Sequence, residues 1–450
     1  MRLRCAAVNF ARTVAEDDHV QTGRLRRLSR LAYLTARTTG DLLAHQARRK
    51  LAGESTPDLS KAAERILGTL GELKGAALKL GHALAMDPDA LPVEARRIVA
   101  RLLTQAPQRM SFEQVADVVR AELGRAPDEL FAEFEREPIA AASLGQVHGA
   151  RLHDGRDVVV KVQYPGVERA LESDLANAAV LVRGLSLTGE ALDGRPYYEE
   201  LRASLLRELD YVQEAEQCRA YASAARGYPE LAVPEVVPDR SSRRVLCLTR
   251  LRGPHLLESM ESLPPEQERY RIGRLLVFAI WGPFYAARRI HGDPHPGNFL
   301  VLPDGRLGVL DFGATKLLSE RFAATYRSFL EANAHGKRAM QVGPALERAG
   351  FRFQAADLGE AYEFCQQLAD IVERPIASDD PYDFGADPMV HDVRRLLQQH
   401  PRMALTIKPP SEAILFYRAA AGLAHDLRLL KVRGRFRPIL GEIQARGRLE

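Results

Sequence analysis

Two short motifs constrain this chain more than any other feature. Residues 291–298 read His-Gly-Asp-Pro-His-Pro-Gly-Asn, and residues 311–313 read Asp-Phe-Gly. Between them lie two apolar segments, 299–302 and 307–310, which a Pro-Asp-Gly turn separates. This pattern predicts a β-hairpin. The hairpin would bring the triplet back beside the end of the first motif, so that polar side chains of the two motifs meet.

The polar residues of these motifs suit phosphoryl transfer. Asn298 follows Asp293 by five positions, which is the spacing of the protein-kinase catalytic loop H-R-D-x-x-x-x-N. Because Mg²⁺ takes oxygen ligands, we expect Asn298 and Asp311 to be metal ligands and Asp293 to orient a hydroxyl or a water. A buried turn with polar caps is the alternative, but it does not explain the order and spacing of loop, hairpin and triplet.

A lysine inside an apolar strand is the next informative feature. Residues 137–142 and 146–152 have strand patterns, 153–156 form a turn, and 157–162 read Asp-Val-Val-Val-Lys-Val. Burying the Lys161 ammonium is costly unless it has a partner. In kinases the strand-three lysine pairs with a helix glutamate and with the α- and β-phosphates. A lysine on a solvated strand face is the alternative reading of the same pattern.

Helical patterns dominate the remainder of the chain. They cover 59–104, 166–226, 265–290 and most of 317–435, and Ser111 with Gln114 has the pattern of a capping box that begins a further helix. Glu208 and Glu214 lie in the second of these segments, six residues apart. They cannot share a contact on adjacent helical turns, so we expect different roles for them. A break at 252–254, Arg-Gly-Pro, is a candidate hinge between lobes.

Charge is unevenly distributed along the 450 residues. The formal net charge is +4, yet residues 1–50 hold eleven Lys and Arg against four acidic residues, a local charge of +7. Within them, residues 24–37 combine helically spaced leucines with five arginines. A basic amphipathic helix of this kind can lie on an anionic membrane. A helix docked on its own protein with a solvated basic face explains the same pattern, and we prefer that interpretation.

Cysteine spacing and hydropathy limit the cellular compartments that suit this chain. The four cysteines, at 5, 218, 247 and 365, are far apart and form no C-x-x-C pair. A reducing cytosol fits this usage, whereas a disulfide framework or a zinc site does not. No uncharged apolar run reaches about 18 residues, so no transmembrane helix is predicted, and no signal peptide is visible. We therefore expect a cytoplasmic protein or one that is peripheral on a membrane.

These motifs together resemble the UbiB/AarF-like atypical kinase family, over roughly residues 24–430. The segment 140–147, Ala-Ala-Ala-Ser-Leu-Gly-Gln-Val, resembles the family's alanine-rich loop, which replaces the glycine-rich nucleotide loop. The segment 160–167 is similar to its strand-three lysine segment, and Glu208-Leu209-Asp210 to its E-x-D motif. Residues 291–298 match its catalytic loop at every position, and 311–313 match its metal motif.

The resemblance implies an α+β, protein-kinase-like two-lobed fold with an amino-terminal helical extension that lids the active site. The implied domains are a helical extension at 1–125, an N-terminal lobe with inserted helices at 126–250, and a mostly helical C-terminal lobe at 251–450. Lys161, positioned by Glu214, would hold phosphates, and Asp293 would be the catalytic group. The nucleotide would be covered by Ala140, Ala141, Ala142, Ser143, Leu144 and Gly145. Alanines restrict φ where glycines do not, so we expect a stiff cover and poor transfer to protein substrates.

One departure from the family pattern concerns the lid. The family signature is K-x-G-Q, and this chain has Lys79, Gly81 and then His82 in place of glutamine. The resemblance implies that this segment latches onto Glu208 and Asp210 above the active site. A neutral imidazole offers one donor and one acceptor and can gain a charge, so His82 either changes the latch or acts as a neutral replacement.

The motifs and the resemblance together predict an atypical kinase-like ATPase that uses ATP and Mg²⁺ in isoprenoid-quinone (ubiquinone) or other membrane-lipid metabolism. Expected partners are the nucleotide, an anionic membrane surface or quinone-like lipid, and lipid-biosynthesis enzymes, but not a nucleic acid. Three alternatives stay open. A small-molecule kinase can carry an H-G-D-x-H-x-x-N loop, an ordinary protein kinase would need an A-P-E segment that does not follow Asp311, and a nucleotide-binding module would lack turnover.

Overall fold

The computed structural model describes residues 109–142, 144–169, 172, 206, 209–335, 341–354, 357–400, 403 and 406–447. Contacts divide the chain into two units, one of residues 1–109 and 166–205 and the other of residues 110–165 and 206–450. The described residues belong almost entirely to the second unit, and the fold below is the fold of that unit. The predicted basic helix at 24–37 lies outside the described residues.

An antiparallel sheet forms the N-terminal lobe. Its strands are β1 (Glu133–Phe134), β2 (Ala140–Ala142), β3 (Gly145–Arg151), β4 (Asp157–Gln163) and β6 (Val245–Thr249). The order is β1-β3-β4-β6, and β2 also pairs with β3. Side chains alternate between the two faces of β4. Val158, Val160 and Val162 are fully buried on one face, and Lys161 lies on the opposite face. The strands predicted at 146–152 and 157–162 are therefore confirmed with small shifts at their ends.

Two helices cover the buried face of this sheet. They are α5 (Phe112–Leu123) and α6 (Pro127–Leu130), and α5 contributes Val115 and Val119 to the apolar cluster beneath β4. The capping box predicted at Ser111 is present, since its hydroxyl accepts from the Gln114 backbone N–H and the Gln114 side chain accepts from Ser111 N–H. Reciprocal capping of this kind satisfies two donors that would otherwise be unpaired, and it fixes where the helix begins.

The C-terminal lobe is mostly helical, as the sequence predicted. Its helices are α10 (Leu256–Ser262), α11 (Glu266–Ala287), the 3₁₀ turn η4 (Pro296–Asn298), α12 (Glu320–Ala334), α13 (Val342–Arg348), α14 (Leu358–Val372), α15 (Arg374–Ala377), α16 (Met389–Gln399), α18 (Ser411–Leu429) and α19 (Arg437–Gly447). Its strands form short sheets: β5 (Leu231–Ala232) with β9 (Leu307–Val309) and β8 (Phe299–Val301), β7 (Arg289–His291) with β10 (Thr315–Leu317), β11 (Arg352–Phe353) with β13 (Ile407–Lys408), and β12 (Tyr382–Asp383) with β14 (Arg433–Gly434). The hairpin predicted between the two motifs is the β8–β9 pair.

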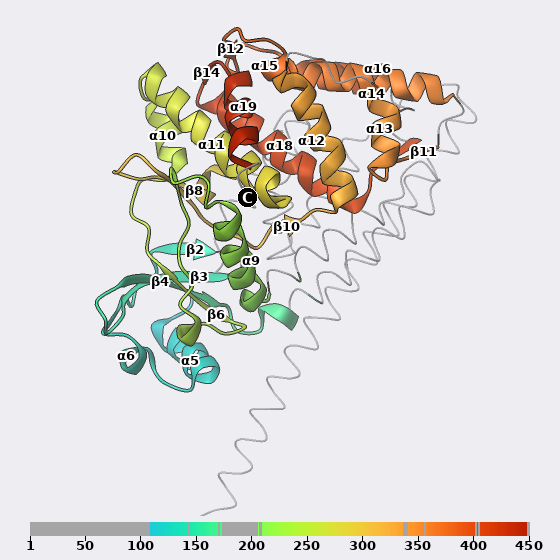
Figure 1. The fold of residues 1–450 in the computed structure, drawn as a ribbon. Coiled ribbons are helices and arrows are strands. Elements are labelled where there is room, and N and C mark those ends of the chain that lie inside the picture. Colours follow the sequence, from blue (N-terminus) through green and yellow to red (C-terminus); the bar gives the residue numbers. More distant parts are fainter. Residues whose placement is uncertain are drawn as a thin grey trace, which may run out of the picture. The chain divides into compact units, whose positions relative to one another are not determined.

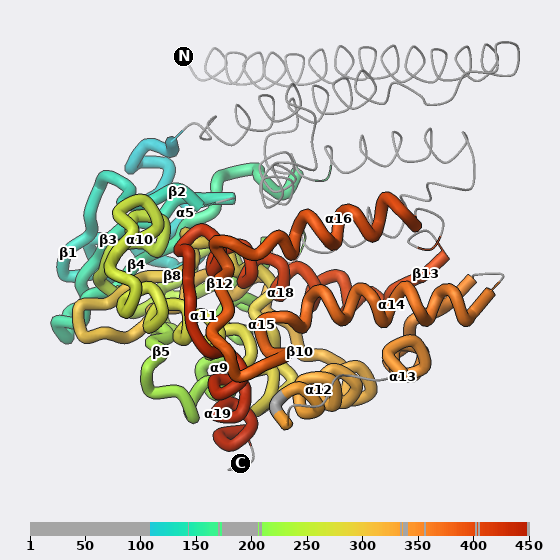
Figure 2. Tube along the Cα trace, turned by 90° about the horizontal axis from the view of Figure 1, so that it is seen from above, coloured from blue at the N-terminus to red at the C-terminus, as the bar shows by residue number. Residues whose placement is uncertain are grey.

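One further helix, α9 (Tyr211–Ala224), lies between the sheet and the helical lobe (Figure 1). It contacts β6 on one side and α11 and β10 on the other. Seen from above, α12, α13, α14 and α16 lie on the side of the unit away from the sheet (Figure 2). The core of the helical lobe is rich in aromatic residues, among them Phe278, Phe284, Phe312 and Phe416. Through α9, this core reaches the sheet that carries Lys161.

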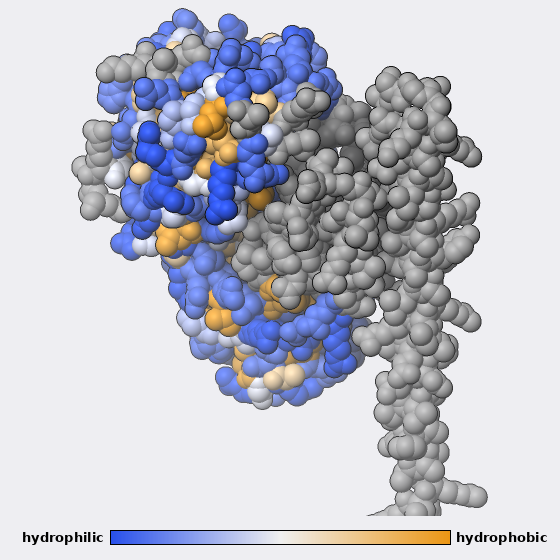
Figure 3. All heavy atoms as spheres, turned by 90° about the vertical axis from the view of Figure 1, so that its right-hand side faces the viewer, coloured by the Kyte–Doolittle hydropathy of each residue, from blue (hydrophilic) through white to orange (hydrophobic). Residues whose placement is uncertain are grey.

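The surface of the described residues is mostly hydrophilic on the face that Figure 3 shows, with apolar residues in scattered patches. Single exposed apolar side chains of this kind are normal for a folded protein. Among the helices that the structure describes, none has the length and apolar character that crossing a bilayer requires.

One carboxyl group, on α18, is buried and not at the surface. The Asp426 side chain is only 1% exposed, and neither of its oxygens has a hydrogen-bond partner within the described part of the chain. Burial raises the pKa of Asp426 well above its ordinary value. An acid whose pKa is higher in the folded state stabilises the fold at low pH and weakens it as pH rises towards that pKa.

We therefore expect Asp426→Asn to remove a pH dependence of stability. Between about pH 5 and pH 8 the wild type should lose up to about 1.4 kcal/mol of unfolding free energy per pH unit relative to the variant. Urea unfolding at both pH values measures this difference. Asp380→Asn, at an exposed position, is the matched control. Parallel pH profiles for wild type and Asp426→Asn would contradict the prediction.

Candidate active site

The Lys161 ammonium is paired with a glutamate from α9. Lys161 Nζ lies 2.9 Å from Glu214 Oε1 and 3.0 Å from Oε2, and the two side chains are 15% and 4% exposed. Asp311 Oδ2 lies 3.9 Å from the same ammonium. Burial acts to lower the pKa of Lys161, but the Asp311 and Glu214 carboxylates outweigh it and raise the pKa. The lysine is therefore a fixed positive charge at neutral pH.

A cap at its own start and contacts with the C-terminal lobe hold α9 in place. Asp210 caps its first turn by accepting from the backbone N–H groups of Val212 and Gln213, at 3.0 and 3.4 Å. At the opposite end, the Tyr221 hydroxyl donates to the Ala279 carbonyl of α11 at 2.6 Å. The Tyr221 ring also packs against Phe312, with centroids 5.3 Å apart. The position of Glu214 is thus set by the C-terminal lobe as well as by its own helix.

The catalytic-loop motif forms the turn between β7 and β8. Asn298 Nδ2 donates to the Asp293 carbonyl at 2.9 Å and lies 3.4 Å from Asp293 Oδ2. The Leu310 backbone N–H donates to the Asn298 carbonyl at 2.8 Å. This backbone bond returns the end of the hairpin to the loop, one residue before Asp311. His291, fully buried, has its Nε2 3.1 Å from the Leu310 carbonyl oxygen, which ties the start of the loop to the same strand.

Asp311 has an unusual backbone conformation. Its φ is 55°, in the left-handed region, where aspartate is tolerated better than most residues. Its Oδ1 accepts from the Gly313 N–H at 3.2 Å, and its Oδ2 is the oxygen that faces Lys161. The carboxylate is therefore directed towards the space between the two lobes, on the side where the lysine lies.

The alanine-rich segment is a strand rather than a free loop. Ala140 pairs with Val147, and Ala142 pairs with Gly145. Ala140 and Ala141 are exposed, while Leu144 is buried. A Cβ at residue 145 would collide with the Val162 carbonyl, so only glycine allows β3 to pass this close to β4. Strand pairing adds to the stiffness expected from the alanines.

Several predicted residues fall outside the described part. Ser143, Glu208 and the lid residues Lys79, Gly81 and His82 are among the residues whose structure is not described. Asp210, the second acid of the E-x-D motif, is described, and its hydrogen bonds with Val212 and Gln213 belong to the α9 cap. The latch between these residues stays a prediction.

Sequence reasoning missed one charged residue at the site. Arg418 Nη2, from α18, lies 2.5 Å from Asp293 Oδ1, and the two residues are 125 positions apart in sequence. A single arginine within an apolar helical pattern carries no local signal of such a contact. The contact becomes visible only in the structure, where α18 packs against the catalytic loop.

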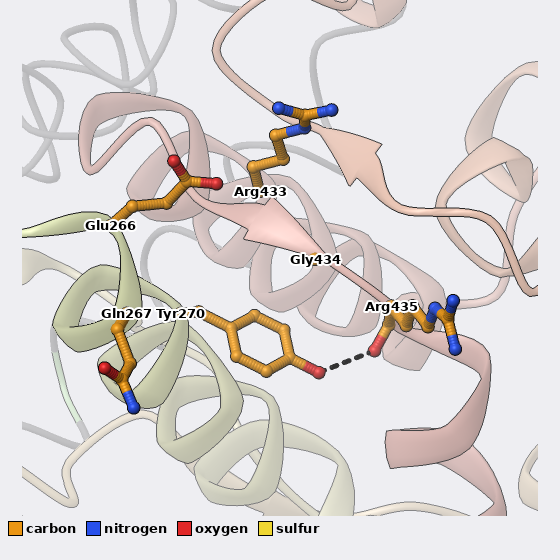
Figure 4. Close-up of a pocket in the computed structure, with 6 residues that line it drawn as sticks. All are labelled: Glu266, Gln267, Tyr270, Arg433, Gly434 and Arg435. Carbon is orange, nitrogen blue, oxygen red and sulfur yellow. Dashed lines mark hydrogen bonds between the residues drawn. The ribbon is translucent and has the colours of Figure 1, made fainter.

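A surface hollow elsewhere in the lobe does not belong to this site. It has a volume of about 460 Å³ and lies between the start of α11 and β14 (Figure 4). The Tyr270 hydroxyl donates to the Arg435 carbonyl at 2.9 Å across it. Its lining contains none of the predicted site residues.

A sheet bearing a lysine, a helix bearing its glutamate partner, and a helical lobe bearing the H-G-D loop and the D-F-G triplet define a protein-kinase-like fold. The sequence profile of the ABC1 atypical kinase-like domain matches residues 101–341. The chain belongs to the ABC1 atypical kinase-like family.

Individual relatives support this assignment. The chain is 28% identical over 439 residues to the mitochondrial atypical kinase COQ8B of Danio rerio, with 94% of this chain and 69% of that protein covered. It is 30% identical over 410 residues to COQ8B of Rattus norvegicus (88% and 76% covered) and 31% over 271 residues to COQ8 of Saccharomyces cerevisiae (59% and 53% covered). The chain thus spans between about half and three quarters of these proteins.

A solved structure shares the fold. The structure of Rv3197 from Mycobacterium tuberculosis, in complex with erythromycin, aligns with a TM-score of 0.57 and 29% sequence identity. The alignment covers 86% of this chain and 96% of that one. In that structure, erythromycin is bound to Rv3197.

The buried ion pair yields a prediction. Glu214→Gln should lower the unfolding free energy by about 1–3 kcal/mol, because it leaves the enclosed Lys161 ammonium without its nearest carboxylate. Glu216→Gln is the matched control, at an exposed position of the same helix, and it should stay within about 0.5 kcal/mol of wild type. Chemical denaturation measures both variants. Equal effects of the two substitutions would show that the pair does not stabilise α9.

Proposed function

We propose that the chain is an atypical kinase-like ATPase that binds Mg-ATP between its two lobes and acts in isoprenoid-quinone metabolism. One observation carries the proposal: the Lys161 ammonium, paired with Glu214, lies 3.9 Å from Asp311 Oδ2. A structural ion pair needs no third charged residue from the opposite lobe. A phosphate-binding lysine beside a metal-binding carboxylate explains why these three meet.

The residues fit a nucleotide with one or more divalent cations. Asn298 turns its Nδ2 towards Asp293, which directs the amide oxygen away from that residue. Asp311 supplies a carboxylate, and the described residues contain no group of three or more His, Cys, Asp and Glu that could hold a metal by themselves. This donor set suits Mg²⁺, which keeps waters and takes phosphate oxygens in its shell. When bound, Mg²⁺ would neutralise charge on the transferring phosphoryl group.

Each side chain has a role in this proposal. Lys161 binds phosphate oxygens as a permanent cation, and Glu214 keeps it from rotating away. Asp293 accepts the hydrogen bond of the attacking hydroxyl or water and orients it. The paired strand β2 would cover a bound nucleotide. Because its backbone is held in the sheet, it cannot close around the phosphates as a glycine-rich loop can.

The metabolic setting rests on relatives. Proteins named COQ8 and COQ8B, described as mitochondrial atypical kinases, match over most or half of this chain, and members of the resembled family support quinone synthesis. We propose that this chain acts on or near an isoprenoid quinone precursor at a membrane surface. ATP turnover by the purified protein, with and without quinone-like phenols and anionic liposomes, tests that setting. No response to either addition would remove the lipid part of the proposal.

The metal-binding role has a sharper test. Asp311→Asn should abolish stabilisation by Mg-ATP and lower turnover roughly 100-fold or more, because a neutral amide replaces a carboxylate ligand. Asparagine also tolerates the positive φ at this position, so the fold should survive. In a thermal-shift assay at about 100 times Kd, wild type should gain about 2.7 kcal/mol.

Asp304→Asn is the matched control, since Asp304 lies in the β8–β9 turn and pairs with Arg306. It should respond to Mg-ATP as wild type does. An undiminished shift and turnover in Asp311→Asn would show that Asp311 is not a metal ligand.

A further inference from the structure

A charged partner of Asp293 comes from outside the catalytic loop. His295 lies two residues further on, and its Nδ1 accepts from the Gly297 N–H at 3.1 Å. A ring nitrogen that accepts a hydrogen bond carries no proton. From α18, Arg418 places a guanidinium at the Asp293 carboxylate.

Close packing fixes α18 against the loop. A Cβ at residue 292 would lie 2.5 Å from Leu415 Cγ and 2.7 Å from the Ala314 carbonyl oxygen. Glycine at 292 is therefore what allows the helix to approach. At its start, α18 is tied to the N-cap of α12, where the Ser319 N–H and hydroxyl donate to Glu412 at 2.8 and 2.6 Å. These contacts therefore also fix the backbone position of Arg418, about two turns further along the helix.

The Arg418–Asp293 contact is partly buried. Nη2 lies 2.5 Å from Oδ1, and the side chains are 27% and 23% exposed. Arg418 Nε is buried without a hydrogen-bond partner in the part of the chain that the structure describes. A guanidinium that leaves a buried donor unsatisfied is unfavourable as a purely structural element. The guanidinium instead contacts Asp293, the residue proposed to orient the hydroxyl or water that attacks the phosphoryl group.

We propose that Arg418 is a positioning residue for phosphoryl transfer, which acts by fixing the orientation of the Asp293 carboxylate. With Oδ1 held by Arg418 and Oδ2 beside the Asn298 amide, the plane of the carboxylate is set by two partners from distant parts of the lobe. The acceptor hydroxyl or water then meets an oxygen at a defined angle. This inference rests on the proposed ATP turnover and adds the group that aligns its catalytic residue.

The test separates turnover from nucleotide binding. Arg418→Met removes the charge at similar length, and kcat for ATP should fall about 10- to 100-fold while Kd for Mg-ATP, measured by calorimetry, stays within about twofold of wild type. Arg418→Lys should recover part of kcat, because an ammonium can still reach the carboxylate. Arg428→Met, at an exposed position of the same helix, should leave kcat and Kd unchanged.

Other outcomes overturn the inference. A wild-type kcat in Arg418→Met would show that Asp293 needs no such partner. A parallel loss of kcat and Mg-ATP affinity would show that Arg418 supports the fold of the site and not the alignment of Asp293. A kcat for Arg418→Lys no higher than that for Arg418→Met would rule out a role of the charge. Absence of turnover in wild type and in Arg428→Met would instead reject the proposed ATPase function, and the inference with it.

Discussion

The ion pair between Lys161 and Glu214 is the interaction on which the candidate site depends. An ammonium and a carboxylate removed from water lose hydration that only good geometry can replace. Here the carboxylate uses both oxygens, at 2.9 and 3.0 Å, and a second carboxylate, Asp311, lies 3.9 Å from the ammonium. Because Lys161 lies on the sheet, Glu214 on α9 and Asp311 in the helical lobe, these three charges link the sheet to the helical lobe.

The structure shows how α9 is kept where this pair requires it. Tyr221 donates to the Ala279 carbonyl in the middle of α11 and packs on Phe312, the central residue of the D-F-G triplet. Gln217 accepts from Arg289 of β7 at 2.6 Å. Moving α9 outwards would break these contacts together, which would leave buried polar groups unpaired. Contacts within the described unit therefore hold Glu214, the partner of Lys161, in place.

Short-range sequence signals predicted the β8–β9 hairpin and the capping box at Ser111. The pairing of Lys161 with Glu214, 53 positions apart, was implied by the family resemblance and not by spacing. Contacts set by helix packing were missed. Arg418 reaches Asp293 only because α18 crosses the loop at a glycine. The two-residue strand pairs in the helical lobe are likewise too short to give a periodic pattern.

The contacts of Tyr221 and Gln217 predict that α9 and its glutamate are in position without nucleotide. Hydrogen–deuterium exchange of the backbone amides of residues 214–224 tests this claim most directly, in the nucleotide-free protein and with saturating Mg-ATP. A preformed pair predicts slow exchange in both states, with at most a small further slowing when nucleotide is added. Fast exchange without nucleotide that becomes slow only with Mg-ATP would show that the nucleotide, and not the contacts of Tyr221 and Gln217, places the helix.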